Sequence, residues 1–215
     1  SNVWVERRFD ERVLVEQAGR FLRTYKNVYS GIFAQYANFG WSPSEQDPPL
    51  SARPVIDRWM ISRLASVERT VDEALEAYDA TAASRAIIEF VDDDVANWYV
   101  RLSRGRFYDV DGEDNRAAFA TLHEVLVSVC RLLAPIAPFV TDWIHRELTG
   151  ESVHLAPFIG ARAERVDPTL DTGMEAIRTL ARLGRAAREE VGIKVRQPLA
   201  YVTCVAPNVR EESLL

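Results

Sequence analysis

Residues 97–107, "NWYVRLSRGRF", place three arginines, an amide and several aromatic rings within one short stretch. Guanidinium groups bind phosphate oxygens, and flat rings and amides contact unstacked nucleobases. On a helix, Asn97, Arg101 and Arg104 share one face, because they are four and three residues apart. Arg106 adds a third positive charge. The chemistry that this stretch favours is therefore the binding of a polyanion.

A second basic stripe follows near the end of the chain. Residues 176–200 contain six basic and two acidic side chains, although the formal net charge of the whole chain is -6. One stripe alone is typical of a solvated helix face. Two stripes, one of them mixed with aromatic residues, favour nucleic acid, and RNA over DNA, because single-stranded loops expose their bases. The basic residues of this stripe are Arg178, Arg182, Arg185, Arg188, Lys194 and Arg196.

Other site chemistries lack support in the sequence. The three histidines form no metal-binding motif, and Asp92, Asp93 and Asp94 point in different directions on a helix, so that they cannot converge on one ion. Glycine-rich phosphate loops and nucleophile-elbow patterns are absent. Cys130 and Cys204 lie among apolar residues and are expected to be buried, unreactive side chains. We therefore expect neither a catalytic residue nor a metal or cofactor site.

Apolar residues recur every three or four positions along most of the chain, which predicts an all-α fold. Helices are expected over residues 10–39, 55–78, from about 80 to 108, 115–133, 139–148 and 168–191, separated by proline- and glycine-containing connectors. Short connectors predict an antiparallel bundle. Trp98 and Leu102 are expected on the inner stripe of the third helix, and Tyr78 on that of the second. Residues 199–205, "LAYVTCV", predict one strand.

Several segments together resemble one known family. They are "KNVYSGIFAQYANF", "DRWMISRL", "FVDDDVANWYVRLSRGRFY", "LLAPIAPF", "SVHLAPF" and "GIKVRQPL". In this order they are similar to the region after the catalytic core of isoleucyl-tRNA synthetases, which are class I aminoacyl-tRNA synthetases. The resemblance covers nearly the whole chain. It implies a helical anticodon-binding domain over residues 1–158 and the start of a C-terminal α+β extension over residues 159–215.

The resemblance also implies a function and partners. A parent enzyme of this family joins isoleucine to tRNA-Ile with ATP and Mg²⁺, in the cytoplasm. The HIGH and KMSKS signatures of the catalytic core are missing here, so this chain alone is expected to be inactive and to hold no cofactor. The expected partners are tRNA-Ile and the other domains of the parent chain, with no role for DNA or a membrane. A valyl-tRNA synthetase domain and a helical protein-interaction module without RNA binding are the alternatives.

The expected RNA contacts combine the basic stripes with positions that the resemblance suggests. Asn27 matches an asparagine that related synthetases bring to the anticodon, although Gly31 replaces an arginine of some relatives; Asn27 is equally typical of an exposed helix residue. Trp98 fits core packing as well as base stacking. The stripe around residues 178–196 fits contact with a tRNA stem or with the missing domains. The candidate tRNA-binding residues are Asn27, Arg58, Asn97, Trp98, Arg101, Arg104, Arg106, Arg182, Arg185, Lys194 and Arg196.

Overall fold

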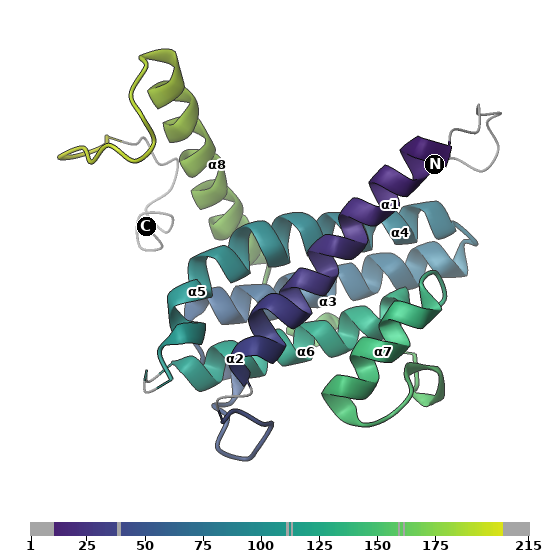
Figure 1. The fold of residues 1–215 in the computed structure, drawn as a ribbon. Coiled ribbons are helices and arrows are strands. Elements are labelled where there is room, and N and C mark those ends of the chain that lie inside the picture. The colour runs from purple at the N-terminus through teal and green to yellow at the C-terminus, as the bar shows by residue number, and fades with distance from the viewer. Residues whose placement is uncertain are drawn as a thin grey trace. The chain divides into compact units, whose positions relative to one another are not determined.

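The computed structural model describes residues 11–37, 40–110, 112, 114–158, 160 and 162–203, and these residues form helices and connectors with no strand among them (Figure 1). The predicted all-α class is therefore confirmed. The chain divides into two compact units, Ser1–Val166 and Asp167–Leu215, and each is described by itself. Within the described part of the chain, no helix is both long enough and apolar enough to cross a membrane.

The described part of the first unit contains two long helices that combine α- and π-helical segments, and three helices that are α-helical throughout. Each long helix contains a central π-helical segment, in which the turns are wider than in an α-helix. Three single 3₁₀ turns, η2 (Leu50–Ala52), η4 (Val153–Leu155) and η5 (Ala163–Arg165), lie in the connectors. The helices are α1 (Glu11–Lys26) with η1 (Asn27–Ala34) and α2 (Gln35–Ala37), α3 (Val55–Glu76), α4 (Ala80–Glu89) with η3 (Phe90–Val100) and α5 (Arg101–Tyr108), α6 (Asn115–Leu133) and α7 (Pro138–Thr149).

The core of the first unit lies around α3, which packs against α4, η3 and α6. Its inward side chains include Met60 and Leu64, and Leu122 and Leu126 of α6 are equally buried. The apolar residues that recur every three or four positions in these two helices are thus buried as far as Val71 in α3 and Leu133 in α6, as the sequence predicts. Trp59 is also fully buried and packs in this core.

The π-helical segment η3 shifts which residues face inward. One row of buried side chains along the α4–η3–α5 helix steps by four residues at a time, through Ile87, Val91, Val95, Tyr99, Ser103 and Phe107. In an α-helix, which has 3.6 residues per turn, side chains four positions apart drift steadily around the helix axis. The wider turns of η3 offset this drift, so that the whole series faces inward. The prediction that Leu102 faces inward is wrong, since this side chain is 56% exposed, and Trp98 is only half-buried.

Tyr78 is a second correction to the sequence-based expectation. Its side chain is 97% exposed rather than buried, because α3 ends at Glu76 and Tyr78 adopts a left-handed backbone with φ of 57°. The amide of Tyr78 donates to the carbonyl of Leu75, and that of Asp79 donates to the carbonyl of Ala74. This pair of bonds is the Schellman motif that commonly ends a helix. The chain reverses here and enters α4, with the Asp79 carboxylate capping the Ala82 amide.

The second unit consists of α8 (Pro168–Glu190) and the segment that follows it. The Asp167 side chain caps α8, and Gly192, with φ of 71°, ends it in a second Schellman motif. Only Leu170, Gly173 and Met174 of α8 are buried, so most of the predicted apolar stripe is not covered. The described part of the predicted strand, residues 199–203, forms no strand, because no described segment pairs with it; residues 204 and 205 lie outside the described residues.

Cys130 is buried on α6, where its Sγ lies 3.0 Å from the hydroxyl of Tyr25. Burial raises the pKa of this thiol to about 12. Because the thiolate is the reactive form, we expect no labelling of Cys130 by a disulfide reagent in the folded Cys204→Ser variant at pH 8. Complete labelling should follow in guanidinium chloride. Fast labelling without denaturant would contradict the burial of Cys130. Cys204 lies outside the described residues.

Candidate nucleic-acid interface

Arg106 differs from the other arginines of its stretch, because its guanidinium is held inside the protein. Two of its nitrogens bond the carboxylate of Asp57, at 2.9 and 2.6 Å, and its Nε lies 2.6 Å from Asp114. Asp57 is fully buried and also accepts a 2.6 Å hydrogen bond from the hydroxyl of Tyr99. This geometry favours a structural role for Arg106, joining α5 to α3, over the RNA contact that the sequence predicted.

Arg101 and Arg104, in contrast, are exposed on α5. Among the described residues, neither forms an ion pair with a carboxylate. Asn97, one turn earlier on η3, is exposed as well. The structure therefore keeps three of the predicted residues of this stretch accessible to a ligand. Their contact with RNA stays a prediction.

The remaining predicted residues of the first unit lie in different surroundings. Asn27 is exposed and is the first residue of η1, while Arg58 is exposed on α3, next to the buried Asp57. Trp98 is half-buried and interacts with other groups of the protein. All three keep at least part of their surface accessible.

A pair of tyrosines beside Arg104 was missed by the sequence analysis. The rings of Tyr36, on α2, and Tyr108, on α5, lie 4.5 Å apart between centroids. The guanidinium carbon of Arg104 is 5.6 Å from the centre of the Tyr108 ring, and Arg104 Nε donates to the Tyr108 hydroxyl. This hydrogen bond lowers the pKa of Tyr108. Periodicity alone could not find the pair, because its two members come from distant parts of the sequence.

The basic stripe of the second unit is also partly structural. Arg188 donates to the carbonyl oxygens of Lys194 and Gln197, at 3.1 and 2.8 Å, and so holds the segment after α8. Arg182 and Arg185 are exposed on α8, and Lys194 and Arg196 are exposed after it. These four predicted residues remain accessible to either of the two expected partners, RNA or the other domains of the parent chain.

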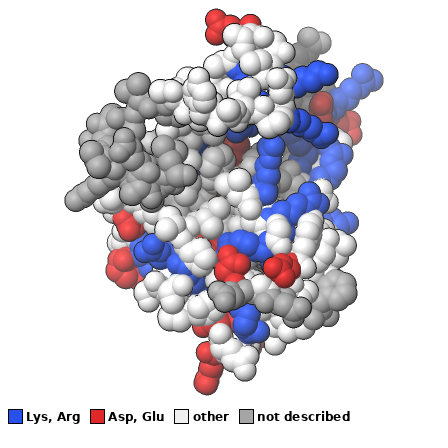
Figure 2. Space-filling model, turned by 90° about the vertical axis from the view of Figure 1, so that its left-hand side faces the viewer, with Lys and Arg blue, Asp and Glu red and all other residues white. Residues whose placement is uncertain are grey.

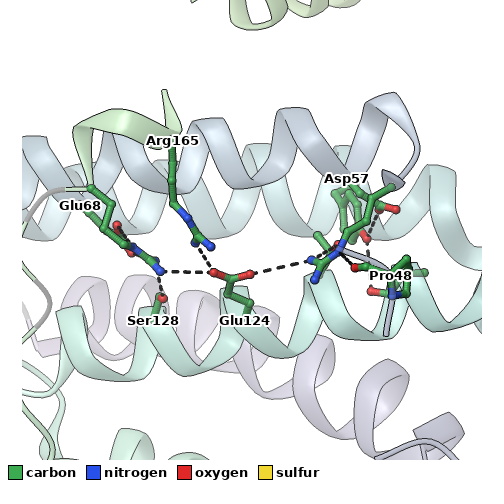
Figure 3. A network of polar contacts seen from close by, with 11 residues as sticks. Pro48, Asp57, Glu68, Glu124, Ser128 and Arg165 are labelled. Carbon is green, nitrogen blue, oxygen red and sulfur yellow. Dashed lines mark hydrogen bonds and ion pairs between the residues drawn. The ribbon is translucent and has the colours of Figure 1, made fainter. Parts of the chain in front are cut away.

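Several other arginines of the first unit join helices rather than offering a free charge (Figure 3). Glu68 of α3 is fully buried and accepts two bonds from Arg162, one of them at 2.9 Å from Nε. Glu124 of α6 bonds Arg162 at 3.2 Å, pairs with Arg165, and lies 3.8 Å from Arg53. This Glu68–Glu124 network fixes the connector before α8 to α3 and α6. Its arginines are therefore poor candidates for RNA contacts.

Basic side chains are present on the surface of the molecule (Figure 2). Figure 2 views the molecule from the side on which α2 and α5 lie in Figure 1. Basic side chains are exposed on this face, with acidic side chains beside some of them. A chain with a net charge of -6 therefore still presents positive surface to a ligand.

Comparison with known proteins agrees with the resemblance seen in the sequence. The family model described as the anticodon-binding domain of tRNA ligase matches residues 57–203. The chain belongs to this family. Several isoleucine-tRNA ligases are similar to this chain. The enzyme of Deinococcus radiodurans is 45% identical over 92% of the chain, and that of Porphyromonas gingivalis is 42% identical over 99% of it. The isoleucine-tRNA ligase of Thermobifida fusca is 44% identical over 97% of the chain.

The matches cover only part of each relative. This anticodon-binding domain chain spans 18%, 19% and 20% of the length of the three ligases. The matched family region, residues 57–203, includes the η3–α5 stretch, the Glu68–Glu124 network and α8. Arg101 and Arg104 of the first unit and Arg182 and Arg185 of the second therefore lie within the part of the chain that matches the family model.

Proposed function

We propose that this chain binds the anticodon stem-loop of tRNA-Ile, and that Arg101 and Arg104 contact the RNA. The observation that carries the proposal is the contrast within one stretch: Arg106 is paired with Asp57, whereas Arg101 and Arg104 are exposed and have no carboxylate partner among the described residues. Exposed guanidinium groups bind phosphates by charge-assisted hydrogen bonds. Asn97 lies one turn from Arg101 and is placed to contact the same loop.

The activity of the parent protein is part of the same proposal. The relatives are named isoleucine-tRNA ligases, and the chain spans about a fifth of their length. We assign to the parent the ATP-dependent attachment of isoleucine to tRNA-Ile, in the cytoplasm, and to this chain the binding of the tRNA. The chain alone should give only background activity in pyrophosphate exchange with isoleucine and ATP. The equivalent domain of a valine enzyme is the alternative within the family, so binding to tRNA-Val is the comparison to make.

The salt dependence of binding tests the role of the two arginines. Each phosphate that is neutralised contributes roughly 0.7 to 0.9 to the slope of log affinity against log salt. We expect the variant Arg101→Ala with Arg104→Ala to lower this slope by about 1.4 to 1.8. Affinity for tRNA-Ile at low salt should fall at least about tenfold, since two charge-assisted bonds are lost. Filter binding over a series of salt concentrations measures both quantities.

A control of equal charge separates local contacts from the effect of net charge. Arg69 on α3 and Arg85 on α4 are also exposed, and Arg85 lies on the helix segment that precedes η3 and α5. Changing both to alanine removes the same charge and should leave the slope within about 0.5 of the wild-type value. Equal slopes for the two double variants would show that Arg101 and Arg104 make no specific phosphate contact. Tighter binding of tRNA-Val than tRNA-Ile would move the assignment to the valine enzyme.

A second candidate function applies to the second unit, residues 167–215, and rests on its uncovered apolar surface. Ile177, Leu180 and Val191 help to line a groove of about 690 Å³ between α8 and residues 193–202. Val195 is 66% exposed beside it. We propose that residues 159–215 begin an α+β extension whose apolar groove is completed by other parts of the parent chain. Stable association with a separately expressed catalytic part would support this role, and retardation of the isolated chain by tRNA would support RNA binding.

A further inference from the structure

The C-terminal end of the long α4–η3–α5 helix carries Tyr108, whose ring contacts that of Tyr36 on α2. Tyr108 is the last residue of α5 and is 42% exposed, and its ring contacts Tyr36 of α2 at 4.5 Å between centroids. In Figure 1, α2 and α5 lie at the same end of the first unit. Tyrosine rings that serve only the core are normally more deeply buried, as Tyr25 and Tyr99 are here. The pair therefore presents aromatic surface to the solvent.

The charge beside this pair has a defined orientation. Arg104 donates from Nε to the Tyr108 hydroxyl and keeps its guanidinium carbon 5.6 Å from the ring centre. Nε is one of three guanidinium nitrogens, so the hydrogen bond uses only one of the five N–H groups. Arg104 forms no ion pair among the described residues. The Tyr108 ring, part of the half-buried Tyr36 ring and one oriented cation are thus accessible at a single place.

We propose that Tyr36, Tyr108 and Arg104 form a stacking site for one unpaired nucleobase of the bound RNA loop. This inference rests on the proposed function and adds a recognition group to it. Unstacked bases in single-stranded loops stack on tyrosine rings and on guanidinium planes, and such contacts do not depend on phosphate. Arg104 takes part in both phosphate binding and base stacking, because its charge is available to the RNA backbone while its Nε donates to the hydroxyl of Tyr108.

The position of the site agrees with the other accessible groups. Arg101 lies one turn before Arg104 on α5, so a backbone bound at Arg101 brings its next bases toward the tyrosine pair. The half-buried Trp98 lies a further turn away, and the inward-facing Tyr99 and Phe107 are fully buried and unable to stack. Of the aromatic residues between 97 and 108, Tyr108 therefore offers the most exposed ring.

The test uses the whole 215-residue chain and RNA hairpins with the tRNA-Ile anticodon loop, each carrying 2-aminopurine at one loop position. Stacking quenches the fluorescence of 2-aminopurine. We expect quenching at one position with the wild type, and its loss in the variant Tyr36→Ala with Tyr108→Ala. The dissociation constant should rise about tenfold, which corresponds to the loss of one stacked base. The slope of log affinity against log salt should not change, because no phosphate contact is removed.

Two controls isolate the ring from fold and charge. Tyr78→Ala removes a phenol that is more exposed than that of Tyr108 and lies just before the opposite end of the same long helix, and it should bind as the wild type does. Tyr108→Phe keeps the ring and should retain quenching. Heparin, a polyanion without bases, should bind the double tyrosine variant as tightly as the wild type. Thermal melting of each variant verifies that the fold is intact.

The outcomes separate this inference from the proposed function. If the double tyrosine variant keeps both affinity and quenching while Arg101→Ala with Arg104→Ala weakens binding, the stacking site is wrong and the proposed function stands. If the tyrosine variant loses heparin as well, the pair acts through charge or fold, and the stacking site is wrong. If no hairpin binds to the wild type at low salt, both the stacking site and the proposed function are wrong.

Discussion

Replacing Asp57 with alanine is expected to lower the free energy of unfolding by about 3–5 kcal/mol. The reason is that Asp57 is fully buried and is the shared acceptor for Arg106 and Tyr99, with bonds of 2.6–2.9 Å. Its removal takes the buried carboxylate from Arg106, which keeps only the more exposed Asp114, and leaves the Tyr99 hydroxyl with the Ala118 carbonyl at 3.3 Å. Removing one partner of a buried ion pair costs more than the pair contributed. Urea denaturation followed by circular dichroism measures the loss.

The matched control for this variant is Asp93→Ala. Asp93 is an exposed carboxylate on η3, so its loss should change stability by no more than about 0.5 kcal/mol. Replacing Arg106 with methionine in the Asp57→Ala background should recover part of the lost stability, because it removes a charge that has lost its buried partner. A loss below about 1 kcal/mol for Asp57→Ala would show that Arg106 is not held by this carboxylate, and would return Arg106 to the candidate RNA contacts.

The second large effect is expected at Glu68. The Glu68→Ala variant should lose about 3 kcal/mol, the lower end of the range for a buried pair, because Arg162 keeps its bonds to Glu124 and Ser128. The connector before α8 should also loosen, since Arg162 is one of the two arginines that fix it to α3 and α6. Trypsin, which cleaves after arginine, should therefore cut at Arg162 and Arg165 faster than in the wild type.

Glu73→Ala is the control, because Glu73 is an exposed carboxylate on the same helix. The Glu73→Ala variant should change the free energy of unfolding by no more than about 0.5 kcal/mol. The rate of cleavage by trypsin should not change. Digestion is compared at a temperature at which both variants are folded. Unchanged cleavage at Arg162 in Glu68→Ala would show that the network does not hold the connector.

The helices were predictable because their signals are local. Pro138 at the start of α7 and Gly150 and Gly192 after α7 and α8 mark boundaries through backbone preferences that the neighbouring residues do not change. The inward residues of α3 and α6 follow the same local periodicity. The π-helical segment η3 does not, because its wider turns move burial from Leu102 to Tyr99 and Ser103. A pattern that assumes 3.6 residues per turn cannot detect this shift.

The candidate site was predictable only in part, because contacts between residues far apart in the sequence decide which arginines are paired and which are exposed. Arg106 and Asp57 are 49 positions apart, and nothing in "RLSRGRF" distinguishes the paired arginine from the exposed ones. The contact of Tyr36 with Tyr108 likewise needs α2 and α5 to lie together. Sequence alone therefore identified the basic stretch, and the structure was needed to separate its structural arginine from its accessible ones.

The central claim is that Arg101 and Arg104, rather than Arg106, meet the RNA, and side-chain NMR tests it most directly. The Nε–H signals of the arginines are assigned from single Arg→Lys variants and followed while the tRNA-Ile anticodon hairpin is added. We predict that the signals of Arg101 and Arg104 shift with the RNA concentration, and that those of Arg106 and Arg162 stay in place. Shifts confined to Arg106, or no shift at Arg101 and Arg104 with the hairpin bound, would contradict the account.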